Sequence, residues 1–142
     1  MSHGGCVEIA GDFALKIAVF CEKFNNASFE LLGKATDLSH EVIALIEDGD
    51  AAAYYAYGAK QVYSMELCDD VCAQGTHIVE ALRQIAPQVA LFPATVRGRF
   101  LSAWSAARLA TGLTADCTDL RLTEDGLLEQ IRPAYGGNYA VP

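Results

Sequence analysis

The sequence has no long apolar run and few basic residues, and these two absences exclude several classes of protein. A membrane-spanning helix needs about 18 or more consecutive apolar residues, and Lys16, Glu22 and Lys23 interrupt the most apolar early stretch. Ten basic against 18 acidic residues give a formal charge of −8, which disfavours nonspecific binding of nucleic acid. The 142 residues, 52% of them apolar, are enough for one domain with a buried core. We therefore expect one soluble domain with no nucleic acid partner and no membrane insertion.

The sequence also lacks the motifs that identify common enzyme classes. It contains no Gly-x-Gly-x-x-Gly, no Walker-type Gly-Lys-Ser/Thr, no Gly-x-Ser-x-Gly elbow and no His-Glu-x-x-His. His3, His40 and His77 are far apart along the chain, and surface or packing roles are favoured for each. No residue is therefore predicted to be catalytic.

Five cysteines leave at least one unpaired, and the first five residues resemble neither a secretory signal nor a transit peptide. We expect a reducing, cytoplasmic location without disulfides. Cys68 and Cys72 are separated by three residues, and together with His77 they match no common zinc spacing. No metal site is predicted, whereas a reductase that cycles Cys68 and Cys72 stays open as an alternative.

Short apolar runs that alternate with helical patterns predict an α/β fold. The stretches Ala14 to Cys21 and Glu41 to Ile46 are typical of strands buried on both faces. The predicted order is strand 14–21, a helix capped by Asn25 or Asn26, strand 41–46, an Ala/Tyr-rich helical segment up to 57, strand 61–65, a helix from Asp69 and Asp70 to before Pro87, strand 89–92 and a helix over 98–111. Right-handed crossovers then give a three-layer α/β/α arrangement with a mostly parallel sheet. Residues 1–13 are expected to be a flexible start, and residues 14–142 to form the domain.

The last thirty residues depart from this alternation. Residues 114–122 and 127–133 are strand-like, and the segment between them carries an Asp-Gly turn signal. A C-terminal β-hairpin is therefore predicted. The strand-like residues 139–141 reach almost to Pro142, so we expect a truncated domain whose unpaired strand edge permits a homodimer.

One loop carries a candidate anion site. Thr95, Arg97, Gly98 and Arg99 follow the predicted strand 89–92 and enter the next helix, in the half of the chain that holds all six arginines. Ligands of open α/β sheets bind at the carboxyl ends of the strands, and free amides at a helix start favour phosphate or carboxylate. These four residues are a tentative anion- or nucleotide-binding loop. In the alternative, both arginines pair with carboxylates of this protein or of a partner.

Two stretches together resemble the alpha subunit of electron transfer flavoprotein. They are Gly-Leu-Thr-Ala-Asp-Cys-Thr-Asp-Leu at 112–120 and Arg-Pro-Ala-Tyr-Gly-Gly-Asn at 132–138, and weaker similarities extend over almost all of 15–142. The resemblance implies the amino-terminal domain of that subunit, a Rossmann-like fold akin to the adenine-nucleotide alpha hydrolases, which packs against a beta subunit in a heterodimer. It makes Arg132, Tyr135, Gly136, Gly137 and Asn138 candidates for domain or subunit contacts, although composition alone favours a structural turn there.

The resemblance also implies what the parent protein does. In the family, FAD is held chiefly by a carboxyl-terminal domain that this chain does not include, so no cofactor is expected on the chain itself. The parent passes electrons through FAD between dehydrogenases and an acceptor, and this domain is expected to be non-catalytic. A stand-alone adenine-nucleotide-binding module that uses the loop Thr95 to Arg99 is the alternative.

One departure from the family concerns the helix after this loop. Family alpha subunits tend to carry aspartate after the Gly-Arg pair and a proline in the helix, whereas this chain has Phe100 and, nearby, Trp104. Core packing is favoured for both aromatic residues at helical spacing. An apolar patch that faces a partner is the alternative.

Overall fold

The computed structural model describes residues 4–8, 16–22, 26–47, 49, 51–66, 69–117, 119–122, 128–134 and 137–141. Its elements are β1 (Gly4–Glu8), β2 (Lys16–Cys21), α1 (Asn26–Leu38), β3 (Glu41–Glu47), α2 (Ala51–Ala56), β4 (Gln61–Met65), α3 (Val71–Ile85), β5 (Val89–Phe92), α4 (Val96–Arg108), β6 (Leu113–Cys117), β7 (Asp119–Leu122), β8 (Leu128–Ala134) and β9 (Gly137–Val141). None of the helices in these ranges is long and apolar enough to cross a bilayer.

The main sheet has six strands in the order β4-β3-β2-β5-β1-β6. Strands β2, β3, β4 and β5 are mutually parallel, which confirms the predicted parallel sheet. Strand β1 pairs antiparallel with both β5 and β6. Gly4–Glu8 lies in the segment expected to be flexible, and the structure pairs it as a strand of the main sheet. Pairing with β1 satisfies backbone groups of β5 that would otherwise form an open sheet edge.

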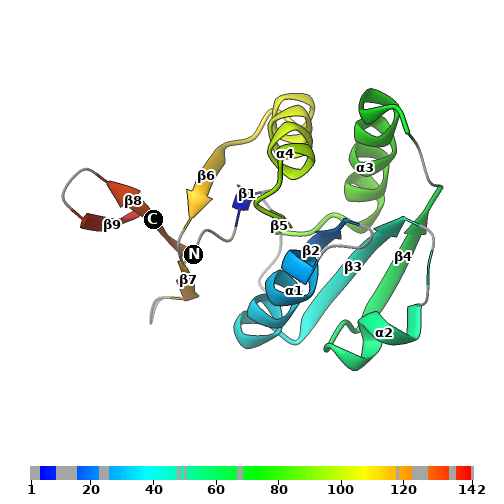
Figure 1. Ribbon diagram of the computed structural model, residues 1–142, viewed down its shortest axis with the longest axis horizontal. Helices are drawn as coiled ribbons and strands as arrows, with labels where there is room; N and C mark the ends of the chain where they lie inside the picture. Colours follow the sequence, from blue (N-terminus) through cyan, green and yellow to red (C-terminus); the bar gives the residue numbers. More distant parts are fainter. Residues whose placement is uncertain are drawn as a thin grey trace.

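Helices cover both faces of the sheet, as Figure 1 shows, with α1 and α2 on one face and α3 and α4 on the other. Alternate residues of one strand pack against the helices of the two different faces, because successive side chains in a strand point to opposite faces. In β2, Ile17 and Val19 pack with Leu31 and Leu32 of α1. The intervening Ala18 and Phe20 belong to the cluster that includes residues of α3 and α4.

The chain adds strands first on one side of β2 and then on the other. From β2 the chain moves outward to β3 and β4, with α1 and α2 on one face, and then returns through α3 to β5 on the other side of β2. The carboxyl ends of β2 and β5 therefore lie side by side at the topological switch point, where open α/β sheets hold their ligands.

The predicted last helix and the C-terminal hairpin are both present, with shifted bounds. Helix α4 starts two residues earlier than expected, and Ala110 takes the left-handed conformation after it, with φ 53°. The strand expected over 114–122 is divided between β6 in the main sheet and β7 in a second sheet. Strands β7, β8 and β9 form this three-stranded antiparallel sheet, which lies beside β6 in Figure 1. The turn between β7 and β8 lies outside the described residues.

Candidate functional site

Polar side chains meet where the apolar strands β2, β3 and β5 end. Glu22 directly follows β2, Glu47 ends β3, and Thr95 lies three residues after β5. Gln74 and Arg97 come from the first turns of α3 and α4. The predicted loop of Thr95, Arg97, Gly98 and Arg99 therefore lies at the switch point, as its position after a strand indicated.

Thr95 joins the start of α4 to the end of β2. Its Oγ1 accepts a hydrogen bond from the Gly98 amide at 2.9 Å, which makes it the N-cap of α4. The same hydroxyl donates to Glu22 Oε2 at 2.6 Å. The Glu22 amide in turn donates to Ser28 Oγ at 2.8 Å, so α1 is tied to this joint as well. One helix-start amide that a phosphate would use is thus already bound within the chain.

Gly98 is required by a close approach of two backbone segments. A Cβ at this position would lie 2.2 Å from the carbonyl oxygen of Pro93 and 3.0 Å from Thr95 Oγ1. A backbone oxygen cannot move aside as the end of a flexible side chain does, so only glycine lets α4 begin here. The glycine that suggested phosphate binding has a packing role.

Arg97 is held through Gln74 to a buried carboxylate. Its Nε donates to Gln74 Oε1, and Gln74 Nε2 donates to Glu47 Oε1. Glu47 is 5% exposed and Gln74 1% exposed, so a buried charge receives both a hydrogen bond and a nearby cation. Arg97 also donates through Nη2 to the backbone oxygen of Asp69 at 3.5 Å. The side chain is committed to the protein itself.

The resulting electrostatics are unfavourable for a phosphate at the start of α4. The Glu22 carboxylate is bound to Thr95, and the Glu47 carboxylate is joined to Arg97 through Gln74, and these negative charges repel an anion. Arg99 is exposed on the first turn and also has a partner within the protein. Anion binding by this loop stays a prediction, with these contacts against it.

Sequence reasoning missed Glu22, Glu47 and Gln74 as members of this group. Glu22 and Glu47 are the first acidic residues after the apolar cores of two strands, and that position is the signal that places them at the sheet edge. Gln74 has no such signal, because its burial depends on how α3 packs against the ends of β3 and α4.

The second candidate set lies in the three-stranded sheet. Arg132 is in β8 opposite Tyr139, and Gly137 and Asn138 begin β9 opposite Ala134 and Pro133. Tyr135 and Gly136 lie outside the described residues. The described residues of this motif therefore lie in two antiparallel paired strands.

The cysteines give no sign of a redox or metal centre in the described part. Cys21 is fully buried next to Glu22, and burial raises the pKa of its thiol to about 12. Cys72 is exposed in the first turn of α3, where its amide donates to the Asp70 carboxylate at 3.0 Å. Cys68 is outside the described residues, and no cluster of His, Cys, Asp and Glu within the described residues could hold a metal ion.

Comparison with known proteins points to one family. The sequence model of the electron transfer flavoprotein domain matches residues 21–141. The chain is 37% identical over 143 aligned positions to the electron transfer flavoprotein subunit alpha of Thermoanaerobacterium thermosaccharolyticum. This alignment covers 86% of this chain and 42% of that protein. It is 40% identical to subunit LctC of the lactate dehydrogenase (NAD(+),ferredoxin) of Acetobacterium woodii, covering 78% of this chain and 29% of LctC. It is 34% identical to protein FixB of Azorhizobium caulinodans, over 78% of this chain and 34% of FixB. The chain thus spans less than half the length of each of these relatives.

Proposed function

Because this chain belongs to the electron transfer flavoprotein domain family, we propose that it is the amino-terminal domain of an alpha-type subunit, with a structural and beta-subunit-binding role. The observation that carries the proposal is the family match over 21–141, which includes β3, β4, β5 and β6 of the main sheet and all of the second sheet. Relatives named electron transfer flavoprotein subunit alpha, LctC and FixB support the alpha-type role over that of a stand-alone module.

The parent protein is proposed to carry electrons through FAD between dehydrogenases and an acceptor in the cytoplasm. Bound flavin would supply the redox chemistry, and this domain would contribute no catalytic group. The described residues at the switch point do not fit a dinucleotide diphosphate, because Thr95 Oγ1 already accepts a hydrogen bond from the Gly98 amide and the Glu22 carboxylate is bound to the same hydroxyl. The proposal therefore places the flavin in the rest of the parent.

The hairpin of β8 and β9 is proposed to contact the beta subunit. Support comes from the motif 132–138, which the resemblance assigns to domain or subunit contacts, and from its location in a sheet separate from the main one. Arg132, Tyr135, Gly136, Gly137 and Asn138 are the proposed contact residues.

Light scattering on the 142-residue chain mixed with the beta subunit tests this role. We expect one complex whose mass is the sum of the two chains. Arg132→Ala is expected to weaken the complex at least tenfold, whereas Lys60→Ala just before β4 leaves it unchanged. Two separate species at micromolar concentrations would overturn the contact role. The same experiment on the chain alone reports whether it forms a homodimer.

The alternative, an adenine-nucleotide-binding module, has its own test. A ligand at one hundred times its dissociation constant stabilises the fold by about 2.7 kcal/mol. We expect no thermal shift with millimolar AMP or ATP, because the loop's amide and Arg97 are already bound within the chain. A saturable shift that disappears in Arg97→Gln would restore the module.

A further inference from the structure

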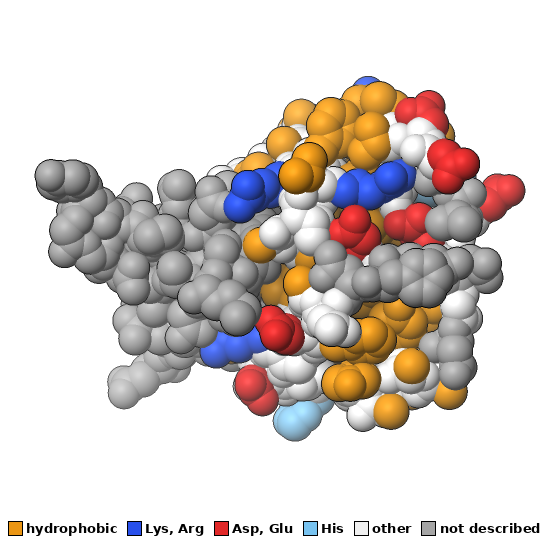
Figure 2. All heavy atoms as spheres, viewed as in Figure 1, with side chains coloured by type: hydrophobic (Ala, Val, Ile, Leu, Met, Phe, Trp, Pro, Cys, Tyr) orange, Lys and Arg blue, Asp and Glu red, His pale blue; other side chains and the backbone are white. Residues whose placement is uncertain are grey.

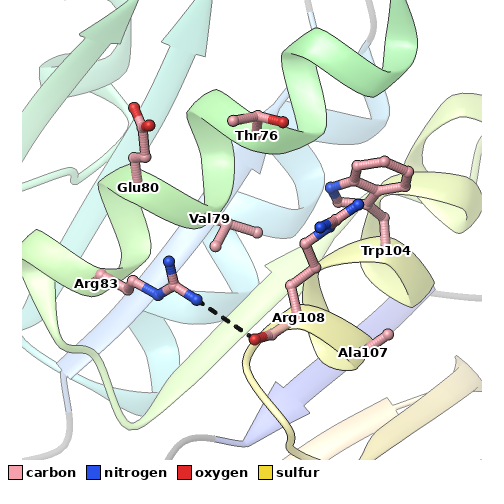
Figure 3. Close-up of a pocket in the computed structure, with 7 residues that line it drawn as sticks. All are labelled: Thr76, Val79, Glu80, Arg83, Trp104, Ala107 and Arg108. Carbon is pink, nitrogen blue, oxygen red and sulfur yellow. Dashed lines mark hydrogen bonds between the residues drawn. The ribbon is translucent and has the colours of Figure 1, made fainter.

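A groove runs between α3 and α4 on the outer side of the molecule, away from the sheet. It has a volume of about 540 Å³, and its lining residues include Thr76, Glu80 and Arg83 of α3 and Trp104, Ala107 and Arg108 of α4. Figure 3 shows that the two helices contribute opposite walls, with the indole and the Arg108 guanidinium together on the α4 side. None of these six residues belongs to the switch-point site or to the motif 132–138.

Trp104, the single tryptophan of the chain, packs against Gly75 of α3. A Cβ on Gly75 would lie 2.6 Å from its Cδ1 and 2.7 Å from its Nε1, so the glycine creates the space for the ring. The buried Nε1 has no hydrogen-bond acceptor among the described residues. A buried donor without a partner is unfavourable, so packing inside the chain does not satisfy this side chain fully.

An apolar stripe continues from the groove along α4. Val96, Phe100 and Trp104 are four residues apart and share one face of the helix. Val96 is 87% exposed and Phe100 43% exposed. The rings of Phe100 and Trp104 stack with centroids 5.8 Å apart. Figure 2 shows hydrophobic side chains on the side of the molecule that α3 and α4 form, and contiguous exposed apolar surface of this kind marks an interaction site.

Two arginines line the groove, one from each helix. The Arg108 guanidinium lies 4.1 Å from the centre of the Trp104 ring, and Arg83 Nη2 lies 3.5 Å from the Arg108 carbonyl oxygen. Both arginines are exposed, on a chain whose net charge is −8. Glu80 lies one turn before Arg83 and gives the groove a negative side. Two arginines against one glutamate give the lining an excess of positive charge, which attracts a partner's carboxylates.

We propose that the α3/α4 groove docks an acidic amphipathic helix of a partner protein. Its apolar side chains would cover Phe100 and Trp104, and its Asp or Glu side chains would pair with Arg83 and Arg108. A channel between two helices accepts a third helix by ridge-into-groove packing, and tryptophan and arginine are the residues that contribute most to interfaces. A membrane surface is disfavoured as the occupant, because the lining residues form a groove between two helices and not a flat face. The inference does not depend on the proposed electron-transfer role.

Intrinsic fluorescence tests the proposal directly, because Trp104 is the sole tryptophan. The probes are a synthetic helical peptide with leucines on one face and glutamates beside them, and a twin in which every glutamate is lysine. Neither peptide contains tryptophan. We expect the glutamate peptide to change the Trp104 emission saturably, and the lysine twin to bind at least tenfold more weakly. Raising the salt from 50 to 500 mM should weaken the glutamate peptide several-fold.

Variants and a vesicle control distinguish the outcomes. Arg83→Gln combined with Arg108→Gln should weaken the peptide at least tenfold, each titration being compared with its own starting emission. Lys34→Gln on α1 removes one positive charge far from the groove and should leave the affinity unchanged. Equal binding of both peptides, no change with either, or equal loss in Lys34→Gln would overturn the proposal. A response to phosphatidylglycerol vesicles without one to the glutamate peptide would also overturn it, in favour of a membrane surface.

Discussion

The two ends of α4 differ in how many of their side chains find hydrogen-bond partners and cover within the protein itself. At the first turn, the Thr95 hydroxyl, the Gly98 amide and the Arg97 guanidinium all have partners within the chain. From Phe100 onward, one face of the same helix carries a half-exposed ring, and the Trp104 Nε1 has no acceptor among the described residues. The first end is a structural joint between α4 and the ends of β2 and β3, and the second is a surface that a partner could complete.

This contrast shows why residue types at a helix start are weak evidence of a ligand. Threonine, glycine and arginine favour anions there, but they also make an N-cap, a close backbone contact and a bridge to a buried carboxylate. The contacts that decide between the two roles come from Glu22, just after β2, and Glu47, at the end of β3.

The largest effect is expected from Gly98→Ala, at the joint. Its Cβ would lie 2.2 Å from the Pro93 carbonyl oxygen, so the first turn of α4 must move away from the end of β5. We expect a loss of about 3 kcal/mol in the free energy of unfolding, measured by urea denaturation. A loss below about 1 kcal/mol would show that the joint is not closely packed.

Thr95→Ala is expected to cost about 2 kcal/mol, because it removes both the N-cap and the partner of Glu22. Thr95→Ser keeps the hydroxyl and serves as the matched control, with a change of less than about 0.5 kcal/mol. Urea denaturation of both variants gives the comparison. Equal losses in the two would show that the threonine methyl group, and not the hydroxyl, matters.

Gly75→Ala perturbs the open side of α4 and has a control in another helix. The new Cβ displaces the Trp104 ring, which can shift more easily than a backbone oxygen, so we expect a loss of about 1 kcal/mol and a shift of the tryptophan emission. Gly33→Ala in α1 meets nothing within 4 Å and should gain about 0.5–1 kcal/mol from the better helix former. A gain in the free energy of unfolding at both positions would contradict the claim that Gly75 makes space for the Trp104 ring.

Arg108→Gln is expected to have the smallest effect on stability. It removes the guanidinium from the Trp104 ring, a contact worth about 0.5 kcal/mol at an exposed site. The emission of Trp104 should move to longer wavelength as water reaches the ring. A loss above about 1.5 kcal/mol would mean that Arg108 is part of the structural framework, as Arg97 is.

Local patterns predicted most of the main elements. The strands at 61–65 and 89–92 have the bounds that the sequence indicated, since short apolar segments between turn residues leave few alternatives. Strand β1 was missed because Gly4, Gly5 and Cys6 have no strand pattern of their own and pair only with the distant β5 and β6. The joint was missed for a related reason, because Glu22 and Thr95 are 73 residues apart in the sequence. The three-stranded sheet was predicted only as a hairpin, because its third strand depends on the register of β8 with β9.

The most direct test of this contrast is a pair of nuclear magnetic resonance titrations on the ¹⁵N-labelled chain, which at 15.2 kDa is of suitable size. One titrant is AMP and the other is the glutamate peptide, and the amides of α4 report on both ends of the helix at once. We predict that the peptide shifts the amides of residues 100–108 together with the Trp104 indole, and that millimolar AMP leaves residues 95–99 unchanged. Saturable shifts at 95–99 with AMP, and none at 100–108 with the peptide, would contradict the account.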